Sequence, residues 1–140
     1  MSETIFIASD HAGFDLKKQI INSMKSNFID LGVDNKDNVN YPDYAKKLVS
    51  KINSTKKSKG ILICGSGIGM SIAANRDKNI RAGLAFKSEI AKLMREHNDA
   101  NVLILPGRFM DIQEAIKCVD KFLNTNFESG RHLNRINKLK

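Results

Sequence analysis

The residue best suited to chemistry in this sequence is Cys64, because a glycine-rich turn follows it directly. The apolar run Ile61–Cys64 predicts a buried strand, and Gly65–Gly69 has glycine at every second position before a helix expected at Ser71–Ala74. A thiol at such a place lies beside backbone N–H groups and a helix N-terminus, which stabilise a thiolate and a negatively charged intermediate. The pattern therefore indicates a reactive thiol next to an anion-binding turn.

Polar residues also follow the other expected strands. Asp10 and His11 come directly after the first strand, and Tyr41 follows the loop beyond the second. Arg108 comes after the fifth strand. In a parallel sheet the carboxyl ends of the strands share one edge, so we expect these side chains to converge with Cys64 in one site.

Two further groups of candidates come later in the chain. His97 and Asn98 end the helix that precedes the fifth strand, so they lie at the other end of that connection. A second subunit supplies them to the cysteine site more easily than the same chain does. The basic tail contains Arg131, His132 and Arg135, and the two arginines are four residues apart on one helical face.

Strand and helix patterns alternate along the chain. The expected strands are Thr4–Ser9, Phe28–Leu31, Ile61–Cys64, Arg81–Phe86 and Val102–Leu105. The expected helices are Gly13–Lys25, Pro42–Asn53, Ser71–Ala74, Ser88–Glu96 and Asp111–Thr125, with a turn at Lys56–Gly60 and a tail at Arg131–Lys140. This alternation predicts an α/β fold: a Rossmann-like three-layer sandwich with a five-stranded parallel sheet, helices on both faces and a C-terminal helical tail. We expect one domain over residues 1–140.

Composition sets limits on the function. The 140 residues are 41% hydrophobic and 27% charged, as in ordinary globular proteins, and the apolar runs are too short to cross a membrane. We predict a cytoplasmic protein. The net charge is +8, and lysines such as Lys17 and Lys18 account for much of the excess, most simply as solvated helix faces. The two cysteines form no paired metal-binding motif, so we expect no structural zinc and no disulfide.

Each candidate also has a purely structural interpretation. Asp10 can cap the first helix, and Cys64 alone can be a small buried hydrophobic residue. The turn is G-x-G-x-G and follows the third strand, so it matches a dinucleotide fingerprint poorly. Cys118 lies on the flank of an amphipathic helix and is expected to pack there. The tail arginines can form a solvated basic end.

A family resemblance changes this balance. The chain resembles the type B ribose-5-phosphate isomerases, within a wider family that includes galactose-6-phosphate isomerase subunits. The resemblance runs essentially end to end and rests on Ser9–Phe14, Tyr41–Ala45, Ile63–Asn75, Glu96–Val102, Gly107–Arg108 and Gly130–His132. One galactose-6-phosphate subunit type lacks the cysteine and the other lacks the His-Asn pair, whereas this chain has both. Ser66 stands where threonine is common, which keeps the hydroxyl.

The resemblance implies that the protein interconverts ribose 5-phosphate and ribulose 5-phosphate in the non-oxidative branch of the pentose phosphate pathway. It gives His97 the ring-opening role, with Asp10 as a helper, and makes Cys64 the base that forms a cis-enediolate. The backbone N–H groups of Gly65, Gly67, Ile68 and Gly69 would hold the enediolate oxygen, and Ser66 would bond the reacting oxygens or relay a proton. Asn98 and Tyr41 would orient the sugar.

A phosphate group needs fixed cations, for which the arginine fork is well suited. We assign this role to Arg108, Arg131 and Arg135, with His11 and His132 assisting. The family places its site between two subunits, so we expect a homodimer, or two such dimers together, with a shared active site. The chemistry is proton transfer, so we expect no metal and no organic cofactor.

Three alternatives stay open at this point. The protein can act on a hexose such as allose 6-phosphate or galactose 6-phosphate, because sequence does not reveal the size of the pocket. It can also be a phosphosugar-binding module without turnover, although the presence of both Cys64 and His97 argues against this. Nucleic-acid binding through the +8 charge is a third alternative, but aromatic residues are only 6% and no basic-aromatic platform is evident, so we expect none.

Overall fold

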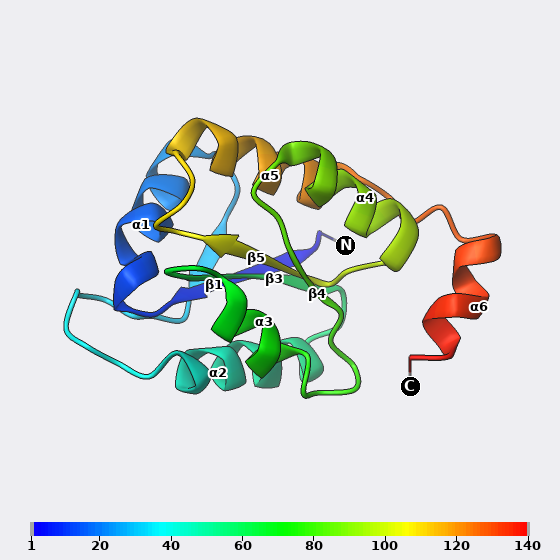
Figure 1. Cartoon of the computed structure of the whole chain (residues 1–140), viewed down its shortest axis with the longest axis horizontal. Helices are drawn as coiled ribbons and strands as arrows, with labels where there is room; N and C mark the ends of the chain where they lie inside the picture. Colours follow the sequence, from blue (N-terminus) through cyan, green and yellow to red (C-terminus); the bar gives the residue numbers. More distant parts are fainter. Residues whose placement is uncertain (1, 140) are drawn as a thin grey trace.

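The computed structural model describes residues 2–139, which fold around a parallel sheet (Figure 1). Its strands are β1 (Thr4–Ser9), β2 (Phe28–Asp30), β3 (Ser58–Cys64), β4 (Ala82–Leu84) and β5 (Val102–Pro106). All neighbouring strands pair in parallel, in the order β2-β1-β3-β5-β4. The predicted five-stranded parallel sheet is therefore confirmed.

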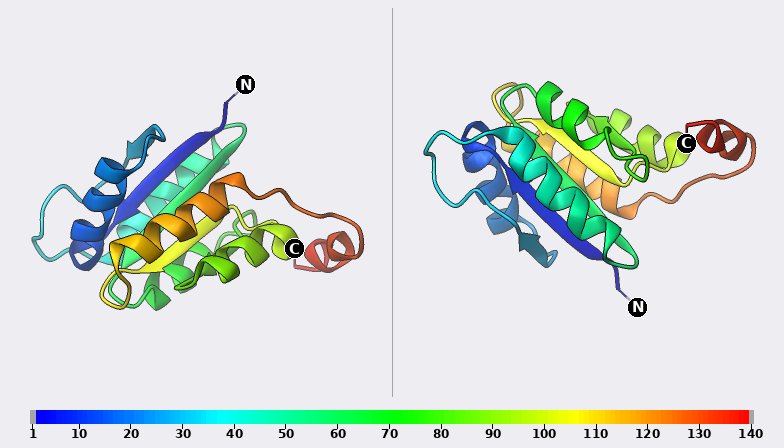
Figure 2. Two further views of the ribbon diagram at one scale, coloured as in Figure 1. Left: turned by 90° about the horizontal axis from the view of Figure 1, so that it is seen from above. Right: turned by 90° about the horizontal axis from the view of Figure 1, so that it is seen from below.

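Helices cover both faces of the sheet (Figures 1 and 2). One face is covered by α1 (Phe14–Ser23), α4 (Ser88–Asn98) and α5 (Ile112–Asn124). The other is covered by α2 (Tyr41–Asn53) and α3 (Ile68–Ala74). The last helix, α6 (Arg131–Asn137), extends beyond the end of α4, as the predicted C-terminal helical tail. None of the helices within residues 2–139 is long and apolar enough to span a bilayer.

Two hydrophobic cores result from this layering. Ile5 and Ile7 of β1 point toward the α1, α4 and α5 layer. Phe6 and Ala8 alternate with them and point toward α2 and α3. Strand β5 is buried along its whole length, as expected for a central parallel strand covered on both faces. The continuous apolar runs in the sequence reflect this double burial.

Two predicted boundaries are wrong around β3. Ser58–Gly60 was expected to be a turn, but these residues form the first three positions of β3 and pair with Thr4–Phe6 of β1. Helix α3 begins at Ile68, three residues before the predicted start, and the Ser66 hydroxyl accepts a hydrogen bond from the Ile68 N–H at 3.2 Å. Pairing with β1 therefore extends the strand beyond its apolar run, and the helix starts within the glycine turn.

The winding of the chain reverses between β1 and β3. The connection after β1 leads to α1 on one face, and the connection after β3 leads to α3 on the opposite face. The connections that follow these two adjacent strands therefore lead away from each other at the carboxyl edge of the sheet. Such a topological switch point is where ligands bind in open α/β sheets.

Lys17 does not belong to a solvated face, contrary to the expectation from its charge. Its side chain is fully buried, and its ammonium group donates to Asp30 Oδ1 at 2.7 Å and to the Val33 carbonyl. The contact joins α1 to the end of β2. We expect Asp30→Ala to lower the free energy of unfolding by about 2 kcal/mol, below the usual cost of breaking a fully buried pair because Asp30 is 35% exposed.

Chemical denaturation of both proteins measures this difference. The matched control is Asp15→Ala, which removes a carboxylate from a pair with Lys36 whose side chains are 69% and 65% exposed. This control should cost less than about 0.5 kcal/mol. Equal losses in the two variants would contradict the importance of the buried pair.

Candidate active site

Cys64 lies at the carboxyl edge of the sheet, and other predicted site residues follow the two strands that neighbour β3. It is buried, with 5% of its surface exposed. Ser9 pairs with Ile63, and the Asp10 N–H donates to the Ile63 carbonyl at 3.2 Å, which puts Asp10 beside Cys64. On the other side, the backbone N–H of Arg108 donates to the Gly65 carbonyl at 3.0 Å. The structure thus brings the cysteine, Asp10 and Arg108 together at the switch point.

The glycine loop is packed between Tyr41 and Arg108. Gly67 has a φ of 78°, a left-handed conformation that favours glycine. A Cβ at Gly69 would lie 2.6 Å from ring atoms of Tyr41, and a Cβ at Gly65 would lie 3.3 Å from Arg108 Nη1. The glycines therefore allow a tyrosine ring and a guanidinium group to approach the loop backbone closely.

Asp10 and His11 are held by local hydrogen bonds. Asp10 is buried, and its Oδ1 accepts from the Gly13 N–H at 3.1 Å, so the structural interpretation of this residue as a cap is confirmed. His11 Nδ1 accepts from the Val39 N–H at 3.2 Å. A neutral His11 therefore has its proton on Nε2, where it is available to donate.

The remaining predicted site residues lie at the opposite end of the sheet. A cavity of about 300 Å³ near the end of α4 is lined by His97, Asn98, His132 and Arg135, together with Ile136 and Leu139. Arg131 begins α6 next to it. In Figure 1 the strands run away from this end toward the cysteine edge. One chain therefore contains two separate groups of candidates, as the position of His97 in the sequence predicted.

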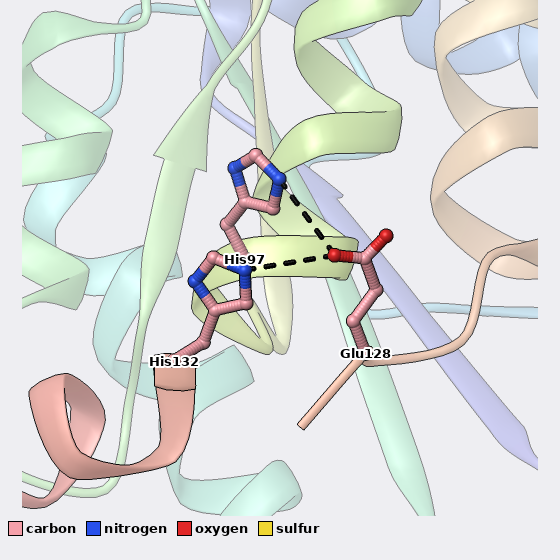
Figure 3. A group of neighbouring side chains, drawn as sticks. All are labelled: His97, Glu128 and His132. Atoms are coloured by element: carbon pink, nitrogen blue, oxygen red, sulfur yellow. Dashed lines mark ion pairs between the residues drawn. The ribbon is translucent and has the colours of Figure 1, made fainter. Parts of the chain in front are cut away.

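His97 and His132 are stacked, with ring centroids 4.4 Å apart and an angle of 19° between the planes (Figure 3). Sequence reasoning missed their neighbour Glu128, whose Oε1 lies 3.5 Å from His132 Nε2 and 3.9 Å from His97 Nε2. The signal was present: Glu128 and His132 are four residues apart, immediately before and within the basic tail. Residues 127–130 were expected to be only a break between helices.

Comparison with known proteins decides the family. A family model described as Ribose/Galactose Isomerase matches residues 5–139. The chain belongs to this family. The predicted resemblance is therefore confirmed over nearly the whole sequence, and membership makes the protein an isomerase.

Individual members of the ribose/galactose isomerase family agree closely with this chain. The ribose-5-phosphate isomerase B of Escherichia coli is 37% identical over 135 residues, covering 94% of this chain and 91% of its own length. The structure of a ribose 5-phosphate isomerase from Thermotoga maritima is 47% identical, with a TM-score of 0.95 over 99% of this chain and 98% of that one. The Mycoplasma genitalium ribose-5-phosphate isomerase B, solved with bound ribulose-5-phosphate, is 46% identical, with a TM-score of 0.92 over 99% and 95%.

The histidine cluster is also the group in residues 2–139 whose composition suits a metal ion. One ligand atom from each of His97, Glu128 and His132 lies within 4.8 Å of the others. The two imidazole rings are stacked, and the Nε2 atoms of both lie 3.9 and 3.5 Å from the same carboxylate oxygen.

His132 tends to be neutral in this isomerase. Burial lowers the pKa of His132, and the nearby His97, Arg131 and Arg135 lower it further, while Glu128 opposes them. A neutral imidazole has a free lone pair and can accept a proton near pH 7.

Cys118 packs inside α5, as predicted, and should be chemically inert. Burial, followed by the nearby Glu114 carboxylate, raises the pKa of its thiol to about 12, so at pH 8 about one molecule in 10⁴ has a thiolate there. We expect iodoacetamide to leave Cys118 unmodified in the folded protein while it alkylates Cys64. Peptide mass spectrometry after a timed reaction tests this, with urea-unfolded protein as the control in which both react. Alkylation of Cys118 at the rate of Cys64 would contradict it.

Proposed function

We propose that this protein interconverts D-ribose 5-phosphate and D-ribulose 5-phosphate. The observation that carries the proposal is the 46% identity and 0.92 TM-score to the Mycoplasma genitalium enzyme that binds ribulose-5-phosphate. The presence of both Cys64 and the His97-Asn98 pair supports a pentose phosphate over galactose 6-phosphate. Under this proposal the enzyme works in the cytoplasm, in the non-oxidative branch of the pentose phosphate pathway.

Cys64 is the proposed base of the isomerisation step. Its thiolate removes the proton from C2 of the open-chain aldose, and the electron pair moves to form a cis-enediolate. The thiol then returns the proton to C1, which gives the ketose. Backbone N–H groups of Gly65, Gly67, Ile68 and Gly69 stabilise the enediolate oxygen, and the Ser66 hydroxyl relays a proton between O1 and O2.

Ring opening precedes this step and needs a second set of groups. His97 takes the proton of the anomeric hydroxyl, and Asp10 assists at the ring oxygen. Asn98 and Tyr41 orient the sugar hydroxyls. The phosphate is bound by Arg108, Arg131 and Arg135, with His11 and His132 assisting.

The two groups of residues form one site only if two copies of the chain pair. Several large apolar side chains stay exposed on α3, around α4 and after β5, which is typical of a protein interface: Ile68, Ile72, Phe86, Ile90, Leu93 and Phe109. A twofold arrangement would place the His97 end of each chain at the Cys64 end of its partner and so create two identical shared sites. Two such dimers can associate further without changing the shared sites.

Subunit exchange tests the shared site. We expect Cys64→Ala and His97→Asn proteins to be nearly inactive alone, because each lacks one half of every site. After mixing in equal amounts and exchange of subunits, half of the dimers are mixed and each has one intact site, so about a quarter of wild-type activity should return. Remixing each variant with itself is the control. No recovery despite mixed dimers, detected by mass spectrometry, would contradict sharing.

The direct test of function is a substrate comparison. Purified protein is incubated with ribose 5-phosphate, allose 6-phosphate and galactose 6-phosphate, and ketose formation gives kcat/KM for each. We expect kcat/KM for ribose 5-phosphate to exceed the values for both hexoses by at least about tenfold, the effect of one additional CHOH unit in a fitted pocket. A higher value for a hexose would reassign the substrate, and binding without turnover would leave a phosphosugar-binding module.

A further inference from the structure

Glu128 belongs to the segment that joins α5 to α6, and this segment is tied to the end of α4. The backbone N–H of Glu128 donates to the Glu96 carbonyl at 3.0 Å. Arg95 Nε donates to the Thr125 carbonyl at 3.1 Å, three residues earlier. The backbone of Glu128 is therefore fixed beside Glu96, the residue before His97 in α4, although Glu128 and His97 are far apart in sequence.

The carboxylate faces the same nitrogen of both stacked histidines. Figure 3 shows both Nε2 atoms turned toward Glu128 and both Nδ1 atoms on the side away from it. His132 is 5% exposed, its Nε2 has no hydrogen-bond partner among the described residues, and the Glu128 carboxylate lies 3.5 Å from that nitrogen. The adjacent cavity is lined by His97 and His132, with Glu128 on the Nε2 side of both imidazoles.

A neutral imidazole has a single proton, which occupies either Nδ1 or Nε2. A carboxylate beside Nε2 attracts the N–H dipole and repels a lone pair at that position, so it favours the tautomer with the proton on Nε2. The separations of 3.5 and 3.9 Å are longer than hydrogen bonds, as is common for acid–base groups before substrate binds. A small movement of the half-exposed Glu128 side chain closes them.

We propose that Glu128 is a positioning residue that keeps the proton of His97 and of His132 on Nε2. This leaves Nδ1 of His97 as the free base that accepts the anomeric hydroxyl proton, so the inference rests on the proposed function of His97 in ring opening. Glu128 gains and loses no proton in this role. Carboxylates that orient catalytic imidazoles elsewhere act in this way once the hydrogen bond to the ring nitrogen has formed.

Nitrogen-15 NMR of histidine-labelled protein tests the tautomers without reference to activity. The chain has three histidines, and His11 is an internal reference because the Val39 N–H fixes its proton on Nε2. At pH of about 8.5, where imidazoles are neutral, we expect wild-type His97 and His132 to be in the Nε2–H form. In Glu128→Gln the amide group can donate to Nε2, so both tautomers should be populated, while His11 stays unchanged.

Kinetic measurements on the same variant test whether the tautomer matters for ring opening. We expect Glu128→Gln to lower kcat for cyclic ribose 5-phosphate about tenfold, with KM nearly unchanged. Ribulose 5-phosphate is an open chain because its 5-hydroxyl is phosphorylated, so exchange of its C1 proton with D₂O needs no ring opening and should keep the wild-type rate. The matched control is Glu96→Gln, which removes the same charge at the residue before His97, where the carboxylate makes no described hydrogen bond or ion pair and only the backbone carbonyl is bonded, to the Glu128 N–H.

The outcomes separate this inference from the proposed function. Mixed tautomers in Glu128→Gln together with a loss confined to the cyclic substrate support the positioning role. Unchanged tautomers, equal effects of Glu96→Gln, or equal losses in both reactions overturn it. A wild-type protein inactive toward ribose 5-phosphate overturns the proposed function alone, because the tautomer measurement still tests whether Glu128 orients the two imidazoles.

Discussion

Cys64→Ala should reduce the interconversion of ribose 5-phosphate and ribulose 5-phosphate by about 10³-fold or more, because it removes the base that forms the enediolate. The substitution removes one sulfur atom at the end of β3 and leaves the glycine loop and Arg108 in place. Binding of the phosphosugar should therefore stay close to wild type. Isothermal titration with ribose 5-phosphate measures binding, and a ketose assay measures turnover.

The matched control for this substitution is Cys118→Ala, which removes the other thiol. Because Cys118 lies in α5 within the core of the opposite layer, its loss should lower stability but leave kcat unchanged. C1 proton exchange of ribulose 5-phosphate should also disappear in Cys64→Ala, since both directions pass through the same enediolate. Full activity in Cys64→Ala would remove the thiol from the mechanism and leave the family assignment intact.

His97→Asn should have the second largest effect, and it should fall on a different step. We expect kcat for cyclic ribose 5-phosphate to decrease about 10²-fold, because ring opening loses its acid–base group. The enediolate step uses Cys64, so exchange of the C1 proton of ribulose 5-phosphate with D₂O should continue at near the wild-type rate. Proton NMR of the C1 signal follows this exchange directly.

Comparison with Cys64→Ala makes the assignment of His97 specific. The cysteine variant should lose both reactions, whereas the histidine variant should lose only the one that starts from a ring. Asparagine keeps a polar side chain at the end of α4, so the cavity near Asn98 and His132 should persist. An equal loss of exchange in His97→Asn would instead give His97 a part in the enediolate step or in substrate binding.

Much of this protein was predictable from local patterns. The alternation of apolar runs and amphipathic segments determined the parallel sheet, since a strand buried on both faces must consist of consecutive apolar residues. The glycine turn after Cys64 and the polar residues after each strand indicated the edge where chemistry would occur. The separated motif blocks further identified the family. Each of these patterns is formed by residues that lie within a few positions of one another in the sequence.

Other features depend on contacts between distant segments, which no local pattern encodes. Lys17 has a charge that suggests solvent, but β2 and the following loop enclose it and Asp30 neutralises it. Ser58–Gly60 is polar enough for a turn, yet pairing with β1 makes it a strand. Glu128 stands in a segment that appears structureless in sequence, and only its attachment to α4 brings it to two stacked histidines.

The sequence by itself determined the fold class, the family and the chemical types of the site residues, because these follow from periodicity and from motif order. The tertiary structure decided which of these residues are neighbours. Parallel strands bring Asp10, Cys64 and Arg108 to one edge, while a helix of fixed rise places His97 at the other. The distance between the two halves is set by the length of α4 and the sheet, which is why two copies of the chain are needed in the proposed site.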